Sequence, residues 1–289
     1  MSKDTDRLAR AGKIAGNLDL LLRAERVAHA VMKGVHGRRR TGTGETFWQF
    51  RPWAPGDARR DIDWRQTAKR GGFDSAVEHG GVFIREMEWE AAQTAWLWRD
   101  ASASMDFGIK KEYAETLLLA LGIVLLNGGE QTGLLGSGLA PQTGVAAVKR
   151  IFAALPAQKE MTEGARPVAA FSHVILIGDF YAPLEDVRDF CARLAARHVT
   201  GTLVQVFDPA EKDLPYKGRV RFEDIEGIDA ADIAQVEAIR DVYARKFAAH
   251  QAALDEMARR SGWRFESFST AVKPETALAQ LCGVLGTHA

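Results

Sequence analysis

From residue 94 onward the chain alternates between short apolar runs and longer segments whose apolar residues recur every three or four positions. Short apolar runs are typical of buried strands, and the three-to-four spacing is typical of helices that cover a sheet. The expected strands are Thr94–Trp98, Gln131–Leu135, Val174–Ile177, Thr202–Phe207 and Phe265–Phe268. The expected helices are a segment after Asp100 that ends at Gly128-Gly129, then Val145–Leu155, Leu184–Val199, Asp232–Arg260 and Pro274–Leu285. This alternation predicts an α/β fold with a doubly wound, mostly parallel sheet.

Residues 1–90 have a different pattern of hydrophobic and polar positions. An amphipathic helix is expected over about Asn17–Lys33, and extended aromatic segments over Thr46–Trp53 and Val82–Trp89. We therefore expect an N-terminal helix and strand extension, residues 1–90, packed on a main domain, residues 91–289. Inside the main domain, Leu214–Phe222 predicts a small inserted hairpin.

Composition narrows the class of protein. The chain has 289 residues, 46% of them hydrophobic, and a formal net charge of zero. Its longest apolar run, Leu117–Leu126, is about half the length that a membrane span needs. We therefore expect no membrane span. The two cysteines, Cys191 and Cys282, form no close pair in the sequence, which fits a reducing compartment, so we expect a cytoplasmic protein. Ten basic residues against four acidic ones between Lys33 and Gly72 could contact nucleic acid, but no nucleic-acid-binding motif accompanies them.

Candidate chemistry begins directly after the first strand of the alternating series, at Asp100-Ala101-Ser102-Ala103-Ser104. Alternate side chains of an extended loop can point to one side, which would bring a carboxylate and two hydroxyls together. Asp179, after a later strand, could supply a second carboxylate. These hard oxygen donors suit Mg²⁺, or Mn²⁺ or Ca²⁺, rather than zinc. The alternative is that Asp100 and the serines only cap the following helix or close the turn.

The run Asp100-x-Ser102-x-Ser104-Met105, followed by a helix and later by a strand that ends at Asp179, resembles the metal-ion-dependent adhesion motif of von Willebrand A domains. The resemblance implies a sheet of the Rossmann-like von Willebrand A type. It also implies a metal ligand from a threonine in a third loop. Thr143 is the first candidate for this ligand and Thr132 the second.

A longer signature lies upstream, in Phe50-Arg51-Pro52-Trp53-Ala54-Pro55-Gly56-Asp57-Ala58-Arg59-Arg60-Asp61-Ile62-Asp63-Trp64. With Leu214–Val220 and the closing strand and helix, it resembles the bacterial domain-of-unknown-function family fifty-eight over roughly Gly37–Leu285. One departure is Gly178, where that family more often has serine. The resemblance implies partnership with a MoxR-type AAA ATPase and with other von Willebrand A proteins.

The signature residues Asp57, Arg60, Asp63 and Trp64 have two interpretations. Their alternating charges could form ion pairs that fix the N-terminal segment on the sheet, with Trp64 in the core. They could instead form a surface on which a partner docks.

Enzyme motifs are scarce in this sequence. It has no Gly-x-x-x-x-Gly-Lys-Ser/Thr loop for a nucleotide and no His-Glu-x-x-His pair for zinc. A metal-dependent phosphoesterase that uses Asp100 remains an alternative. Against a phosphatase with an aspartyl nucleophile, Ser102 stands where such enzymes usually carry a second aspartate. We therefore expect a non-enzymatic protein-binding module with a metal-ion-dependent adhesion-type site. The family resemblance implies that it is an adaptor or co-chaperone of a MoxR-type AAA ATPase.

Overall fold

The computed structural model describes residues 19–32, 46–52, 62–69, 82–88, 93–158, 161, 163–164, 166–223 and 230–285. The chain separates into two compact units. The smaller unit spans Arg40–Ala92, and the larger unit contains Gln93–Ala289 together with the N-terminal segment. The helix at residues 19–32 therefore belongs with the sheet domain, whereas the sequence pattern groups it with the strands that follow it.

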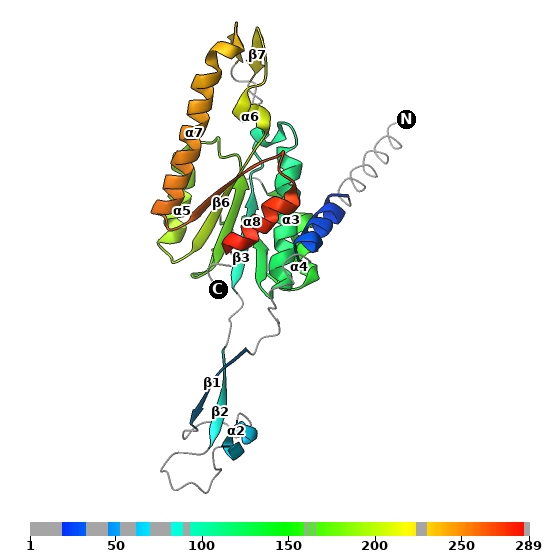
Figure 1. Ribbon diagram of the computed structural model, residues 1–289, viewed down its shortest axis with the longest axis vertical. Helices are drawn as coiled ribbons and strands as arrows, with labels where there is room; N and C mark the ends of the chain where they lie inside the picture. Colours follow the sequence, from blue (N-terminus) through cyan, green and yellow to red (C-terminus); the bar gives the residue numbers. More distant parts are fainter. Residues whose placement is uncertain are drawn as a thin grey trace. The chain divides into compact units, whose positions relative to one another are not determined.

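The larger unit is built on one parallel sheet (Figure 1). Its strands lie in the order β4-β3-β5-β6-β9. Their bounds are β3 Thr94–Arg99, β4 Gln131–Leu134, β5 His173–Gly178, β6 Thr200–Phe207 and β9 Arg264–Ser269. The five parallel strands confirm the predicted α/β class and its doubly wound sheet.

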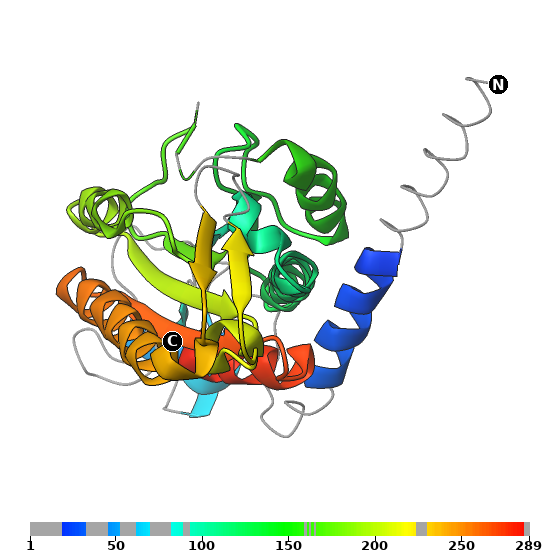
Figure 2. The same cartoon turned by 90° about the horizontal axis from the view of Figure 1, so that it is seen from above.

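Helices cover both faces of this sheet (Figure 2). Their bounds are η3 Ala103–Asp106, α3 Lys110–Asn127, α4 Val145–Ala154, η4 Leu155–Ala157, α5 Leu184–Ala195, α6 Pro209–Asp213, α7 Val236–Arg260 and α8 Pro274–Leu285. Successive strand side chains point to opposite faces, so Leu97 joins the core under α3 and α8 while Trp96 joins the core under α5 and α7. No helix in the described part of the chain is long and apolar enough to cross a bilayer.

The bounds predicted around the inserted hairpin are wrong. The long helix begins at Val236 rather than Asp232, because Ala230–Ile233 forms strand β8 and pairs with β7, Val220–Glu223. The inserted hairpin consists of β7 and β8 and not of Leu214–Phe222. The backbone of Leu214 ends α6 in a left-handed conformation, with φ of 45°.

In its described residues, the smaller unit contains a two-stranded antiparallel sheet and a short helix. β1, Thr46–Pro52, pairs with β2, Phe83–Glu88, and both lie within the extended segments that the sequence predicts. The helix α2, Trp64–Lys69, is not indicated by the sequence pattern.

Candidate functional site

The carboxyl ends of the parallel strands bring several polar residues to one edge of the larger sheet. Asp100 follows β3, Asp179 follows β5, Asp208 follows β6 and Thr270 follows β9. The backbone N–H of Asp100 donates to the carbonyl of Ile177 over 2.8 Å, which fixes the start of the loop against β5. Open parallel sheets present their functional loops at this edge. The sequence pattern thus places Asp100 and Asp179 at the correct end of the fold.

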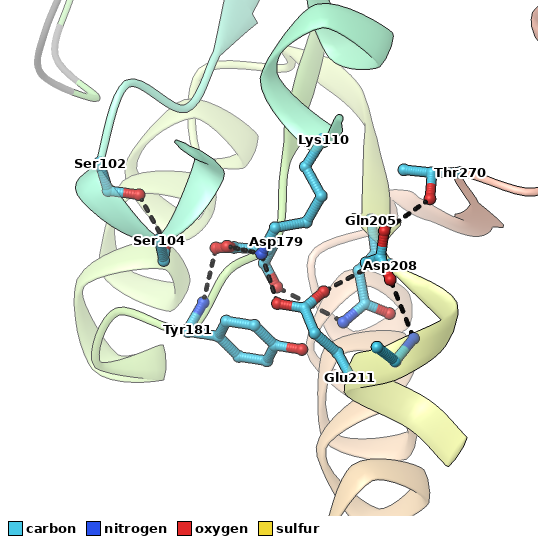
Figure 3. Close-up of polar contacts among 10 residues, drawn as sticks. Ser102, Ser104, Lys110, Asp179, Tyr181, Gln205, Asp208, Glu211 and Thr270 are labelled. Carbon is cyan, nitrogen blue, oxygen red and sulfur yellow. Dashed lines mark hydrogen bonds and ion pairs between the residues drawn. The ribbon is translucent and has the colours of Figure 1, made fainter. Parts of the chain in front are cut away.

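The loop from Asp100 to Ser104 brings its polar side chains together, and Figure 3 shows the contact between Ser102 and Ser104. The Asp100 carboxylate accepts a hydrogen bond of 2.8 Å from the Ser102 N–H. The hydroxyls of Ser102 and Ser104 lie 2.9 Å apart. The Met105 side chain is fully buried in the core beneath them and anchors the short helix η3.

The alternative interpretation, that Asp100 and the two serines only close the turn or cap the following helix, is correct for Asp100 but not for the serines. Asp100 does close the turn by accepting the Ser102 N–H. Ser102, however, makes no side-chain cap to η3, and the residue before α3, Ile109, cannot cap with its apolar side chain. The two hydroxyl groups therefore have no capping role and face each other at the sheet edge.

Gly178 explains how Asp100 can lie so close to β5. A Cβ atom at Gly178 would lie 2.7 Å from the Asp100 Cβ and 3.1 Å from its Oδ2. Contacts below about 3 Å between carbon atoms are repulsive, so any larger residue would displace the carboxylate. Glycine at position 178 therefore fits the close packing of Asp100 against β5.

The Asp100 carboxylate is buried close to a second carboxylate, that of Asp179. Burial raises the pKa of its carboxyl group above 3.8, and the negative charge of Asp179 raises it further, while the Ser102 hydrogen bonds and Arg99 act in the opposite direction. The Arg99 guanidinium instead pairs with Glu115 at 2.9 Å. Among the described residues, no basic side chain forms an ion pair with the Asp100 carboxylate.

Asp179 has a countercharge that the sequence pattern does not indicate. The ammonium group of Lys110 lies 2.8 Å from Asp179 Oδ2 and 2.5 Å from Glu211 Oε1 (Figure 3). The Lys110 side chain is 0% exposed, and its ammonium lies 5.2 Å from the centre of the Tyr181 ring. The other Asp179 oxygen accepts a bond of 3.3 Å from the Tyr181 N–H. A fully buried lysine is rare and is tolerated only with such partners.

Glu211 and Asp208 hold α6 at the same edge. The Asp208 side chain accepts from the Ala210 N–H, and Glu211 Oε2 accepts from the Asp208 N–H, a reciprocal capping box. Thr270 donates to Asp208 Oδ2 over 3.3 Å. Burial raises the pKa of the Glu211 carboxyl group, although its bond to Lys110 opposes this effect.

Sequence signals for these additional residues are weak. Lys110 starts a helix next to a second lysine, Lys111, and a lysine at such a position is usually solvent-exposed. Asp208-Pro209-Ala210-Glu211 has the spacing of a capping box, which could have identified α6. Only the tertiary structure brings Glu211 to Lys110.

The two threonines that the resemblance offers as ligands do not reach this edge. Thr132 pairs with Ala95, five residues before Asp100, which corresponds to about 16 Å along a strand. Gln142 pairs with Thr132 in the antiparallel sense, so Thr143 lies one step further from the carboxyl edge, and it is exposed. Among Asp100, Ser102, Ser104, Thr143 and Asp179, the structure therefore brings together all but Thr143.

The upstream signature lies in the smaller unit, and two of its residues, Asp57 and Arg60, lie outside the described residues. The Asp63 carboxylate accepts a 2.9 Å hydrogen bond from the Gln66 N–H and so caps α2. Trp64 is 57% exposed, so its prediction as a core residue is wrong. Asp63 thus has a local structural role, and Trp64 lies on the surface.

The donor set at the sheet edge fits a hard cation in part. No cluster of three or more His, Cys, Asp or Glu side chains suited to a metal occurs among the described residues. The available donors are instead the Asp100 carboxylate with the Ser102 and Ser104 hydroxyls, opposite Asp179. A buried carboxylate that lacks a countercharge is stabilised by a cation, and hydroxyl and carboxylate oxygens suit Mg²⁺ or Mn²⁺.

Comparisons with known proteins identify relatives but no activity. Residues 49–253 match the family described as "Protein of unknown function DUF58". The chain is 29% identical to the uncharacterized proteins Mb1516 of Mycobacterium bovis and Rv1480 of Mycobacterium tuberculosis, over 83% of this chain and 80% of each relative. A crystal structure of the conserved hypothetical protein BatB from Bacteroides thetaiotaomicron covers 68% of this chain and all of its own, at 12% identity and a TM-score of 0.36. That structural likeness is too low to carry an argument.

Proposed function

This chain belongs to the DUF58 family of proteins of unknown function, and we propose that it is a non-enzymatic protein-binding module with a divalent cation at the carboxyl edge of its sheet. Asp100, Ser102 and Ser104 would hold the cation, Mg²⁺ or Mn²⁺, opposite Asp179. The cation would in turn bind an acidic group of a partner protein. The single observation that carries the proposal is the buried Asp100 carboxylate, which has two hydroxyls beside it and no ion-pair partner among the described residues.

The chemistry of this donor set favours recognition over a purely structural site. One carboxylate and two neutral hydroxyls leave a divalent cation with residual positive charge and with open coordination positions. A carboxylate from another protein can supply both the missing charge and a ligand. On the basis of the family resemblance, we propose a MoxR-type AAA ATPase as the partner.

The alternative function, a metal-dependent phosphoesterase that uses Asp100, has less support. A phosphoryl transfer site needs cationic groups that contact the substrate phosphate. The lysine at this edge, Lys110, is enclosed and bound to two carboxylates, so it has no access to a substrate. Hydrolysis of p-nitrophenyl phosphate that disappears in Asp100→Ala would favour the phosphoesterase.

Thermal unfolding with and without Mg²⁺ or Mn²⁺ tests the cation site. A ligand that binds only the folded state raises the unfolding midpoint by mass action. We expect the cation to raise the midpoint of the wild type and to leave that of Asp100→Ala unchanged. Lys111→Ala is a matched control, because Lys111 pairs with Asp106 on the exposed surface and should keep the full shift. Equal shifts in wild type and Asp100→Ala would contradict the proposal.

Partner binding is measured separately. A MoxR-type ATPase immobilised on a surface should retain the 289-residue chain in Mg²⁺ and release it in a chelator. Asp100→Ala should bind weakly under both conditions. Chelator-resistant binding that Asp100→Ala leaves unchanged would place the interface elsewhere on the molecule.

A further inference from the structure

Lys110 is the ion-pair partner of Asp179, and we propose that it withholds Asp179 from the divalent cation and thereby keeps the affinity of the cation site low. The proposal rests on the proposed function, since it concerns the same site. It assigns to Lys110 the role of a positioning residue that acts through Asp179.

Lys110 is a resident cation of the acidic cluster. Its ammonium contacts Asp179 and Glu211, and its side chain is 0% exposed. The rings of Phe107 and Tyr181 lie 5.8 and 5.2 Å from the ammonium, which places their electron-rich faces around it. An ammonium group removed from water is stable only where carboxylates neutralise it. Asp179 and Glu211 therefore hold Lys110 firmly in place.

The two aspartates at the sheet edge are consequently unequal. Both oxygens of Asp179 have donors, Lys110 and the Tyr181 N–H. Among the described residues, the Asp100 carboxylate accepts hydrogen bonds only from Ser102. A cation that arrives at Asp100 would therefore meet one carboxylate without an ion-pair partner and one that is already paired with an ammonium group.

The connection along the chain strengthens this arrangement. Lys110 begins α3, the helix that follows the loop of Asp100, Ser102 and Ser104. The segment that provides the proposed ligands thus also provides the ammonium that occupies Asp179. Glu211 keeps the ammonium in position, because its second oxygen is fixed by the Asp208 N–H at 2.8 Å. Because Asp179 is paired with Lys110, it would not supply its negative charge to the cation. An acidic group of the partner protein would supply that charge instead.

Two variants should change the affinity in opposite directions. In Lys110→Met/Glu211→Gln, one positive and one negative charge are removed together, which leaves the net charge unchanged and frees Asp179. We expect this double variant to bind Mn²⁺ about tenfold more tightly than the wild type, as a second free carboxylate near a divalent cation gains Coulomb energy. In Glu211→Gln alone, Lys110 is left with Asp179 only and the site is less negative, so we expect binding about threefold weaker.

The experiment uses the full chain and reads free Mn²⁺ by electron paramagnetic resonance, with circular dichroism to verify folding. Tighter binding in the folded double variant together with weaker binding in Glu211→Gln supports the role of Lys110. General structural damage would weaken both. Unchanged or weaker binding in the folded double variant overturns the proposal.

Asp100→Ala in each background separates this inference from the proposed function. If Mn²⁺ binding is the same with and without Asp100 in every background, the cation site itself is wrong. If only the double variant binds Mn²⁺ and its binding requires Asp100, the inference is right that Lys110 withholds Asp179 from the cation. In that case the wild type binds no divalent cation, and the proposed function is wrong. If the wild type binds through Asp100 but the double variant shows no gain, the role of Lys110 alone is wrong.

Discussion

Asp100 and Asp179 are buried carboxylates that follow neighbouring parallel strands, yet they differ in how their charge is balanced. Asp179 has an ammonium group at 2.8 Å, whereas the Asp100 carboxylate accepts a hydrogen bond from the Ser102 N–H and forms no ion pair among the described residues. In the folded protein, the Asp179 carboxylate thus already has an ion-pair partner. The half of the edge around Asp100 is suited to an added charge, and this difference teaches which side of the edge serves structure and which side serves binding.

The largest expected effect is on the free energy of unfolding, and it should differ between a variant of Lys110, beside Asp179, and a variant of Asp100. Lys110→Met leaves Asp179 and Glu211 buried beside each other, and we expect a loss of about 3–5 kcal/mol in the free energy of unfolding. Asp100→Asn keeps the acceptor for the Ser102 N–H and removes an unbalanced charge, so we expect a change within about 1 kcal/mol. Urea unfolding in the absence of divalent cations measures both. Similar losses in the two variants would show that the two halves are equally structural.

The close approach of Asp100 to β5 gives a second, smaller effect. In Gly178→Ala the new Cβ would lie 2.7 Å from the Asp100 Cβ, so we expect a loss of about 1–3 kcal/mol and weaker Mn²⁺ binding. Gly283→Ala is the matched control, because a Cβ there has nothing within 4 Å and should not destabilise the protein. Full Mn²⁺ binding by Gly178→Ala would mean that the position of Asp100 is not critical.

The smallest effect concerns His250, whose ring lies 5.6 Å from that of Tyr181 on the side of Asp179. Burial lowers the pKa of His250 below 6.5. A lowered pKa means that the unfolded chain takes up the proton first, so stability is lost as pH falls from about 6.5 through the folded pKa. We expect His250→Gln to remove this part of the acid sensitivity. Urea unfolding between pH 7 and pH 5, values chosen to bracket the usual histidine pKa of about 6.5, measures it. An unchanged slope in the variant would contradict the assignment.

Local patterns are enough for the fold class and for part of the site. Apolar strand runs and helical spacing are properties of neighbouring residues, and they predict each strand of the parallel sheet. Parallel strands carry their carboxyl ends to one edge, so the order of strands and helices along the chain is enough to place Asp100 and Asp179 together. The loop spacing likewise places Ser102 beside Ser104, which the 2.9 Å distance between their hydroxyls matches.

Long-range contacts decided the rest. Lys110 and Glu211 are separated by 101 residues, and nothing in either local sequence indicates that their charges meet in the interior. Thr143 is excluded by the strand register, which fixes distances along the sheet that a sequence does not contain. The sequence by itself therefore determined which residues stand at the sheet edge. The tertiary structure decided which of their charges are already balanced, because burial and ion pairing depend on groups far apart in the chain.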